Sequence, residues 1–364
     1  MRLVVKIGSN IITASGGLDE GRIRAIAGDI SGLFRSGHEV AVVSSGAIAA
    51  GMGKLGFRKK PVEIKMKQAI AAVGQSSLMW AYEKVFAENG IKVAQVLLTR
   101  DVFSDRARYI NSKNTILTLL DLKIVPIINE NDTVAIDEIR FGDNDQLAAL
   151  VASLIEADRL FILSDVDGLF DSDPKENSGA RLMGVIEEIT PELEKMAGGS
   201  GSLVGTGGMY SKLLAAKKAV SSGIIVNIIN GRKPGLMNEI LSGKNRGSEF
   251  RPKGERLSAR KGWIAYGAKA KGRLIIDDGA KEALTHKGKS LLPSGVLAVE
   301  GDFKNGDPVY CVTARGERVA KGISNYSSEE IQKIKGKKTS DIEAVLGYRY
   351  SDEVIHRDNL VLVG

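Results

Sequence analysis

The stretch VPIINENDTVAIDEIRFGDNDQLAAL, residues 125–150, is the most informative part of this chain for its fold class. An apolar run over residues 124–128 predicts a buried strand, and residues 129–132 end it with four polar or acidic side chains. Alternating apolar residues at Val134, Ile136 and Ile139 predict a short β-ribbon, and residues 142–145 lead into an apolar helix over 146–155. Polar groups that gather where a strand ends, and again where a helix begins, are typical of the active-site crevice of an α/β sheet.

An alternative interpretation of the same residues is an Asn/Asp turn followed by an Asp N-cap, because these residue types are favoured at both positions. One such cluster would need no further explanation. Two clusters within about twenty residues favour a functional site.

The first 240 residues alternate between predicted strands and helices. Strands are predicted over residues 3–7, 40–43, 93–98, 160–163 and 224–229, and helices over 19–36, 61–89, 111–121 and 213–221. This alternation predicts an α/β fold, with a mostly parallel sheet between two layers of helices. From residue 271 onward, short strand-like segments separated by Gly/Asp turns predict a small barrel-like β domain with short helices. The domain boundary is expected within residues 245–268.

Composition limits the classes of function. A length of 364 residues leaves room for roughly two domains. No apolar run approaches the ~18 residues of a membrane span, and the N-terminus lacks the apolar region of a signal peptide. Cys311 is the only cysteine, which suits a reducing cytoplasm. The three histidines are scattered, so a His/Cys metal site or a Ser-His-Asp triad is not expected.

The positive charge of the chain is concentrated in one stretch. The net charge is +7, and residues 244–273 contain ten Lys/Arg against two Glu. Such a stretch can bind nucleic acid or an acidic partner. The alternative is a solvated linker face.

Lys6 lies inside the first predicted strand, where an uncompensated charge is costly. We interpret it as a ligand for a phosphate group over the turn at Gly8 and Ser9. The alternative is that its side chain snorkels to solvent at the end of the strand.

Two further segments predict anion sites. The strand over 40–43 runs into Ser44-Ser45-Gly46 and a helix of small residues, whose free N-terminal N–H groups favour an anion. Residues 198–212, GGSGSLVGTGGMYSK, are the most glycine-rich part of the chain and end on Lys212 at the start of a helix. The G-x-G-x-x-G match at residues 51–56 is dismissed as a dinucleotide motif, because it follows a helix instead of joining a strand to one.

Six segments, taken in order, resemble the glutamate 5-kinases, which are members of the amino-acid kinase family. They are VVKIGSN (4–10), VVSSGAIAAG (42–51), VPIINENDTV (125–134), FGDNDQLAALVA (141–152), LSDVDGLF (163–170) and VGTGGMYSKLLAA (204–216). The tail resembles the PUA domain that many bacterial members carry. The resemblance implies an amino-acid kinase domain over residues 1–250, a basic linker over 251–268 and a PUA domain over 269–364.

The resemblance implies ATP-dependent phosphorylation of the γ-carboxylate of L-glutamate, the first step of proline biosynthesis, with Mg²⁺ carried mainly by ATP. Lys6 and Lys212 would stabilise the transferring phosphoryl group, and Asp145 would hold both lysines in position. The residues expected to bind glutamate are Ser45, Asp132 and Asn144. The residues expected to bind ATP are Lys6, Ser164, Asp165, Thr206, Gly207, Gly208, Met209, Tyr210, Ser211 and Lys212.

The residue-level interpretation agrees with this chemistry. A carboxylate is already ionised at neutral pH, so the reaction needs no general base. Catalysis then rests on positioning and on charge neutralisation, which lysines, glycine loops and helix N-termini provide.

The family also implies partners: proline as a feedback inhibitor, glutamyl phosphate reductase as a functional partner, and a homodimer or homotetramer. Two alternatives remain open at this point. One is a kinase for another acid or phosphate, such as N-acetylglutamate, aspartate, carbamate, UMP or isopentenyl phosphate. The other is an RNA-binding or RNA-modifying protein that acts through the basic stretch and the PUA-like tail.

Overall fold

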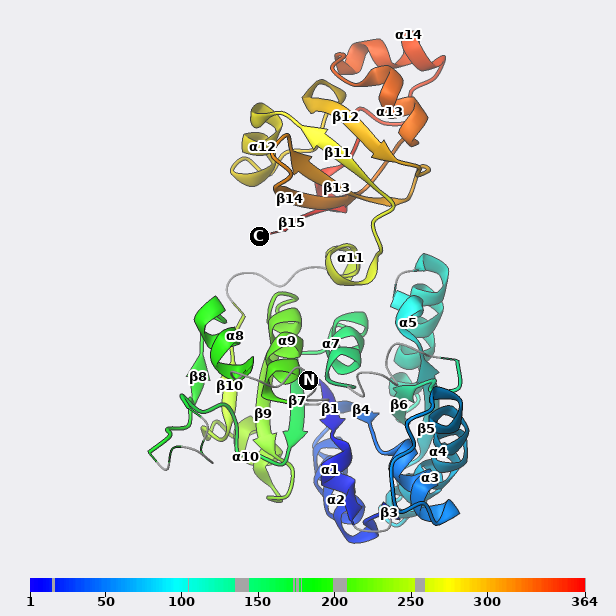
Figure 1. Ribbon diagram of the computed structural model, residues 1–364, viewed down its shortest axis with the longest axis vertical. Coiled ribbons are helices and arrows are strands. Elements are labelled where there is room, and N and C mark those ends of the chain that lie inside the picture. The colour runs from blue at the N-terminus through cyan, green and yellow to red at the C-terminus, as the bar shows by residue number, and fades with distance from the viewer. Residues whose placement is uncertain are drawn as a thin grey trace. The chain divides into compact units, whose positions relative to one another are not determined.

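The chain forms two compact units in a computed structural model (Figure 1). The model describes residues 1–14, 17–103, 105–134, 144–172, 174, 177, 179–198, 208–252 and 259–363. The first unit contains residues 1–102 and 107–256, and the second contains residues 103–106 and 257–364. None of the helices in the described ranges combines the length and apolar character that a membrane span requires.

The first unit is built on an eight-stranded sheet in the order β5-β6-β4-β1-β7-β9-β10-β8. From β5 to β9 all neighbours pair in parallel, while β10 is antiparallel to β9 and parallel to β8. The strands are β1 Arg2–Ile7, β4 Glu39–Ser44, β5 Val93–Leu98, β6 Val125–Glu130, β7 Arg159–Ser164, β8 Val185–Ile186, β9 Ile225–Asn230 and β10 Ser248–Phe250, and a separate hairpin joins β2 Thr13–Ala14 to β3 Gly17–Leu18.

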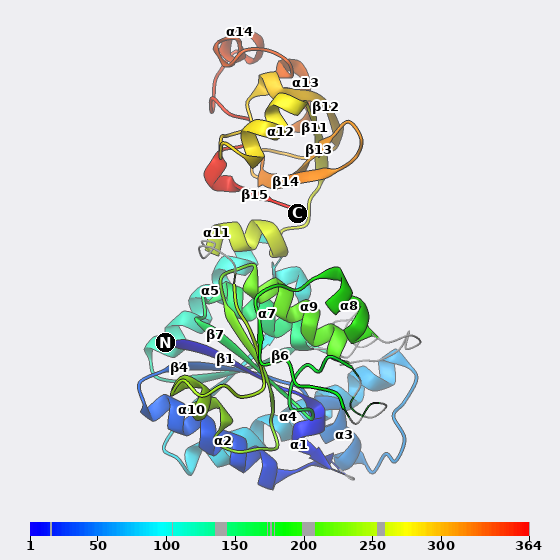
Figure 2. The same cartoon turned by 90° about the vertical axis from the view of Figure 1, so that its left-hand side faces the viewer.

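Helices cover both faces of this sheet (Figure 2). One layer contains α1 Ser9–Ile12, α2 Glu20–Arg35, α3 Ala47–Leu55, α4 Ile64–Ala87 and α10 Leu236–Leu241. The other contains α5 Arg106–Asp121, preceded by the 3₁₀ turn η1 Arg100–Phe103, and α7 Asn144–Leu154, α8 Pro191–Gly198 and α9 Met209–Val220. The predicted three-layer sandwich with a mostly parallel sheet is confirmed.

Successive side chains of β1 point alternately toward the two layers of helices. Leu3, Val5 and Ile7 pack with apolar residues of α2 and α4 in the main core. Because successive strand residues point to opposite faces, Lys6 points toward the other layer, where α7 lies. This is why a lysine can occupy a buried strand beside a fully apolar core.

Several predicted boundaries differ from the structure. The helix expected from residue 111 begins earlier, at Arg106. Its start was missed because two arginines, Arg106 and Arg108, interrupt the apolar pattern of the first turn. Val134 is 65% exposed in a turn, so the predicted ribbon is not present at this residue. Ile136 and Ile139 lie outside the described residues. The segment assigned to a basic linker contains the helical turn α11 Ala259–Gly262 and the π-helical turn η2 Trp263–Gly267, in which Trp263 and Ile264 are buried.

The second unit has a five-stranded sheet in the order β12-β11-β13-β14-β15. Its strands are β11 Gly272–Ile276, β12 Val296–Gly301, β13 Pro308–Thr313, β14 Arg318–Ile323 and β15 Leu360–Leu362, and its helices are α12 Asp278–Thr285, α13 Ser328–Ile334 and α14 Ile342–Leu346 with the 3₁₀ turns η3 Pro293–Gly295, η4 Thr339–Asp341 and η5 Arg357–Asn359. The predicted small C-terminal β domain is confirmed. Cys311 is fully buried there, and burial raises the pKa of its thiol to about 12.

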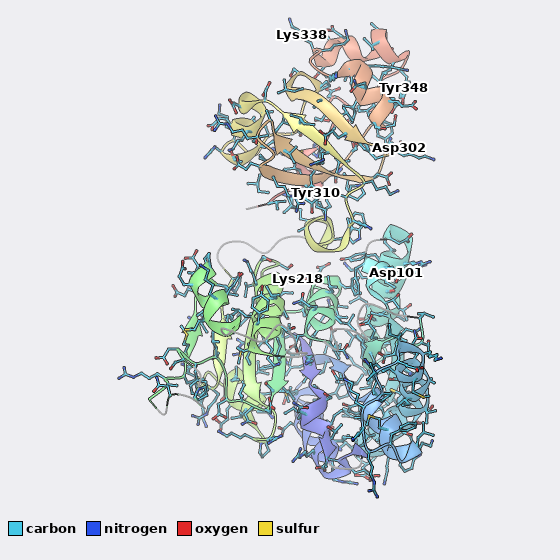
Figure 3. All side chains as sticks on the ribbon, in the orientation of Figure 1. Asp101, Lys218, Asp302, Tyr310, Lys338 and Tyr348 are labelled. Atoms are coloured by element: carbon cyan, nitrogen blue, oxygen red, sulfur yellow. The ribbon has the colours of Figure 1, made fainter. Side chains whose placement is uncertain are left out.

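Lys321 is a buried charged residue of the second unit. It is 4% exposed on β14, and its ammonium donates hydrogen bonds to the backbone carbonyls of Ala265 and Ala268. Tyr310, which is labelled in Figure 3, lies beside two cations. The Arg318 guanidinium is 4.5 Å and Lys321 Nζ is 5.6 Å from the centroid of its ring. Burial, and then the positive charge of Arg318, lower the pKa of Lys321 to about 8.

Many cations of the basic stretch over residues 244–273 are paired with carboxylates. Lys244 and Arg246 pair with Glu239, and Arg251 pairs with Glu249. In the second unit, Lys271 pairs with Asp307 and Arg273 with Glu300. These exposed pairs partly neutralise the stretch, as expected for a solvated face.

Candidate active site

The polar ends of four parallel strands lie at one edge of the sheet. β1, β4, β6 and β7 run in the same direction, so their carboxyl ends meet at this edge. They supply Lys6 from β1, Ser44 from β4, Asn129 from β6 and Ser164 from β7, and each of these polar side chains is buried. The first turn of α7 brings Asn144 and Asp145 to the same edge.

A buried ion-pair cluster lies at the centre of this edge. Lys6 Nζ is 2.5 Å from Asp145 Oδ1, and Lys212 Nζ is 3.4 Å from Asp145 Oδ2. Asp145 is 0% exposed, and the two lysines are 4% and 6% exposed. The cluster therefore holds two cations and one anion away from solvent, and its net positive charge favours an anionic ligand. Lys6 does not snorkel to solvent.

Gly8 allows a ligand to approach this cluster closely. A Cβ added at Gly8 would lie 3.7 Å from Lys6 Nζ and 3.4 Å from the carbonyl oxygen of Leu163. A side chain at position 8 would therefore lie beside the ammonium group of Lys6. Because glycine has no side chain, a ligand can approach this ammonium group from the side of the turn after β1, as a bound phosphate needs to do.

A pocket of about 170 Å³ lies next to the cluster. The three residues predicted to bind substrate, Ser45, Asp132 and Asn144, all line it. Asn144 and Asp145 are consecutive in the first turn of α7, so one residue faces the pocket while the next bridges the two lysines. This adjacency joins the pocket to the cationic cluster.

The helix that borders the pocket offers it unpaired N–H groups. α3 begins after Gly46, whose φ of 106° is in the left-handed region, and no side chain caps this end. Gly46, Ala47 and Ile48 line the pocket together with Ser45. A helix N-terminus in this position favours a carboxylate or phosphate.

Comparison with known proteins agrees with this geometry. The model of the amino acid kinase family matches residues 1–230, and the model of the PUA domain matches residues 272–346. The glutamate 5-kinase of Syntrophotalea carbinolica is 50% identical over 361 residues, which cover 99% of this chain and 97% of that protein. The glutamate 5-kinase of Caldanaerobacter subterraneus subsp. tengcongensis is 51% identical over 364 residues, covering 100% and 98%. The chain belongs to the glutamate 5-kinases.

Membership of the glutamate 5-kinases favours the kinase over the alternative of an RNA-modifying protein. Among solved structures, the UMP kinase of Bacillus anthracis matches with a TM-score of 0.49 at 16% identity, covering 70% of this chain and 96% of that one.

Two of the residues expected to bind the nucleotide, Ser164 and Asp165, lie at the carboxyl end of β7, the strand that pairs with β1. Asn10 Nδ2 is 3.4 Å from a carboxylate oxygen of Asp165, which follows Ser164 at the end of β7. Partial burial acts to raise the pKa of Asp165. Hydrogen bonds from its own backbone N–H and from Asn10, together with the charge of Lys212, lower it below the usual value of an aspartate.

The glycine-rich segment is described only from Gly208. Gly208 precedes α9 in an extended conformation, and no side chain caps this helix. Met209, Tyr210 and Ser211 form the first turn of α9, and Lys212 follows in the same helix. Thr206 and Gly207 lie outside the described residues.

Sequence analysis did not assign a role to several polar residues of this site. Asn129 and Glu130 were noted only as part of a polar cluster at the end of a strand, and both line the pocket. Lys60, on the segment between α3 and α4, also lines it. Asn10 and Gln75 enter the site only through side-chain hydrogen bonds, and their partners are 155 and 54 residues away in the sequence. No local pattern could have indicated them.

Proposed function

We propose that this glutamate 5-kinase transfers the γ-phosphoryl group of ATP to the γ-carboxylate of L-glutamate, the first step of proline biosynthesis. The observation that carries this proposal is the buried Lys6–Asp145–Lys212 cluster, which adjoins a pocket lined by Ser45, Asp132 and Asn144. Family membership supports the same substrate and reaction.

The reaction consists of one substitution at phosphorus. A γ-carboxylate oxygen of glutamate forms a bond to the γ-phosphorus of ATP, and the bond from that phosphorus to the β,γ-bridging oxygen breaks. The electron pair of the broken bond leaves with ADP, and γ-glutamyl phosphate is the other product. No proton has to be removed from the nucleophile, because a carboxylate is ionised at neutral pH.

In this proposal, Lys6 and Lys212 stabilise the negative charge on the transferring group. Their ammonium groups converge on Asp145, which neutralises one of the two charges and fixes both side chains. One net positive charge remains for the phosphoryl oxygens, at a site where burial strengthens the interaction. Asp145 acts as a positioning residue.

The proposed binding mode of glutamate follows from the charges of the pocket. Asp132 and the side-chain oxygen of Asn144 accept hydrogen bonds from the α-ammonium group. Ser45 and the N-terminus of α3 receive the α-carboxylate. The γ-carboxylate then points toward Lys6 and Lys212.

ATP is proposed to lie against Ser164, Asp165 and residues 206–212. The uncapped start of α9 and the charge of Lys212 suit its phosphates. Among the described residues, no group of three or more His, Cys, Asp or Glu side chains could hold a metal ion. Mg²⁺ is therefore proposed to bind mainly through the nucleotide, where it would neutralise phosphate charge.

An assay of ADP release tests the proposal, with hydroxylamine added to trap the acyl phosphate. L-Glutamate, aspartate and N-acetylglutamate are compared, and the Lys212→Met variant is measured beside the wild type. We expect hydroxamate from glutamate alone, lost in the variant. Turnover of another acid in preference to glutamate would assign the pocket to a different substrate.

Inhibition by proline, a functional link to glutamyl phosphate reductase, and a homodimeric or homotetrameric state are proposed from the family alone. RNA binding by the PUA domain is likewise proposed from the family alone. Size-exclusion chromatography with light scattering, and activity assays with added proline, test the first and third of these directly.

A further inference from the structure

A chain of side-chain amides leads from helix α4 to the substrate pocket. Gln75 Oε1 accepts a hydrogen bond of 2.8 Å from Asn129 Nδ2, and Asn129 Oδ1 accepts one of 2.8 Å from Asn144 Nδ2. Asn144 lines the pocket, whereas Gln75 is not among its lining residues. Gln75 therefore reaches the substrate site through two other residues.

Two backbone groups determine which atom donates and which accepts in every hydrogen bond of this series of side-chain amides. The carbonyl oxygen of Ser44 can only accept, so Asn144 must present its Nδ2 to it, at 2.8 Å. The N–H of Glu130 can only donate, so Asn129 must present its Oδ1 to it, at 2.9 Å. Asn129 Nδ2 is then the group that faces Gln75. The amide orientations thus follow from fixed backbone donors and acceptors, and the network admits one arrangement.

The arrangement decides which atom of Asn144 is offered to a ligand. Both hydrogens of its Nδ2 are used, one on the carbonyl oxygen of Ser44 and one on Asn129 Oδ1. The remaining polar atom of the side chain is Oδ1, which is an acceptor. Asn144 therefore adds an acceptor to a pocket that two acidic residues, Glu130 and Asp132, also line. Acceptors and negative charge in one pocket suit an ammonium group.

We propose that Gln75 is a positioning residue that selects for the α-ammonium group of the substrate. It anchors the Asn129 amide, which anchors the Asn144 amide with its oxygen toward the pocket. This inference rests on the proposed function, because it assumes that the pocket holds glutamate.

The packing of α4 supports such a role. A Cβ at Gly74, the residue before Gln75, would lie 1.8 Å from the carbonyl oxygen of Ala47 in α3. Helix α4 is thus held at backbone distance from α3, and the position of Gln75 is fixed. Among the described residues, the buried Gln75 Nε2 has no hydrogen-bond partner. The side-chain hydrogen bond of Gln75 is therefore the one that its Oε1 accepts from Asn129.

Two variants and one substrate analogue test the inference. Gln75→Met keeps the length of the side chain and removes the acceptor, while Gln75→Glu keeps an acceptor for Asn129. Glutarate, which is glutamate without its ammonium group, serves as a competitive inhibitor. Gln95→Met is the matched control, because Gln95 is exposed on the edge strand β5.

For Gln75→Met we expect the KM for glutamate to rise about fivefold to tenfold, the size expected for one lost hydrogen bond. The KM for ATP and the Ki for glutarate should not change, and Gln75→Glu and Gln95→Met should behave like the wild type. A parallel rise of the glutarate Ki, or an unchanged glutamate KM, would overturn the inference. So would a glutamate KM in Gln75→Glu as high as that in Gln75→Met. A wild-type enzyme that does not phosphorylate glutamate would instead refute the proposed function.

Discussion

Gly74 in α4 and Ala47 in α3 are in contact through their backbones, since a Cβ at position 74 would lie 1.8 Å from the Ala47 carbonyl oxygen. Gly51 in α3 makes the reciprocal approach, with an added Cβ 2.0 Å from the carbonyl oxygen of Ile70 in α4. Two glycines therefore let these helices pack at a distance that no side chain permits. The contact holds the N-terminus of α3, and with it Ser45, against the substrate pocket.

The Gly74→Ala substitution should destabilise the protein and weaken glutamate binding. The new methyl group forces α3 and α4 apart, at a cost of about 1–3 kcal/mol in the free energy of unfolding, as for overpacked cores. Because α3 borders the pocket, the KM for glutamate should rise as well. Gly28→Ala in α2 is the control, since a Cβ there meets nothing within 4 Å and should stabilise slightly. Urea denaturation and steady-state kinetics of both variants check this; equal stabilities would contradict the packing argument.

Removing either lysine of the buried cluster should lower turnover more than substrate affinity. We expect Lys6→Met and Lys212→Met each to lower kcat by about 10²- to 10³-fold, the loss typical of one donor to a developing charge. Lys84→Met serves as a control, because Lys84 pairs with Glu20 on the surface of the first unit. A kcat for Lys6→Met within a few-fold of the wild type would remove Lys6 from the proposed mechanism.

The Asp145→Asn variant should be both less stable and less active. It leaves two buried ammonium groups without their shared carboxylate, and breaking a buried pair in this way costs about 3–5 kcal/mol. Sulfate can replace part of the lost negative charge. Its addition should therefore raise the melting temperature of the variant more than that of the wild type. An equal sulfate effect on both proteins would show that the two lysines are not the anion site.

Asp132→Asn should specifically weaken recognition of the ammonium group. The carboxylate lines the pocket, and its loss should raise the KM for glutamate by about tenfold or more, as for a charge-assisted hydrogen bond. The Ki for glutarate should fall or stay constant, because this inhibitor carries no ammonium group. Inhibition assays with glutarate distinguish this result from a general distortion of the pocket.

The stability of the second unit should increase with pH through the titration of Lys321. Its pKa is lowered to about 8 in the folded protein, whereas an unfolded lysine titrates near about 10.4. Between these pH values the unfolded chain binds the proton and the folded chain does not, so the free energy of unfolding rises with pH over this window. Relative to Lys321→Met, the wild type should therefore gain stability from pH 8 to pH 10.

Tryptophan fluorescence can follow this unit alone. The chain has two tryptophans, and Trp80→Phe leaves Trp263 as the only one, in the second unit. Denaturation curves at several pH values, with and without Lys321→Met, check the prediction. A stability difference that is constant from pH 7 to pH 10 would contradict it.

The fold could be predicted from sequence where hydrophobic runs were long and continuous. Strand β5 begins and ends at the predicted residues, and the helix expected from residue 19 begins at Glu20, with Asp19 as its N-cap. Strands β8 and β10 were missed because two or three residues carry no periodicity. The G-x-G-x-x-G match was correctly dismissed, since two of its glycines lie within α3 and the third ends that helix.

The site was less accessible to sequence analysis, for a geometric reason. The predicted residues lie beside one another because each comes from the end of a strand or the start of a helix, which local sequence reveals. Asn129, which orients Asn144, also lies at the end of a strand, but the residue that holds Asn129 does not. Gln75 lies in the middle of a long helix, and only the folded chain brings it to Asn129.

The order in which the cluster is assembled follows from its positions along the chain. Lys6 and Asp145 emerge from the ribosome well before Lys212, and they form a neutral pair. The surplus positive charge arrives only when α9 has been synthesised and has docked beside α7. A nascent or truncated chain that ends before α9 therefore has no preference for phosphate at this site.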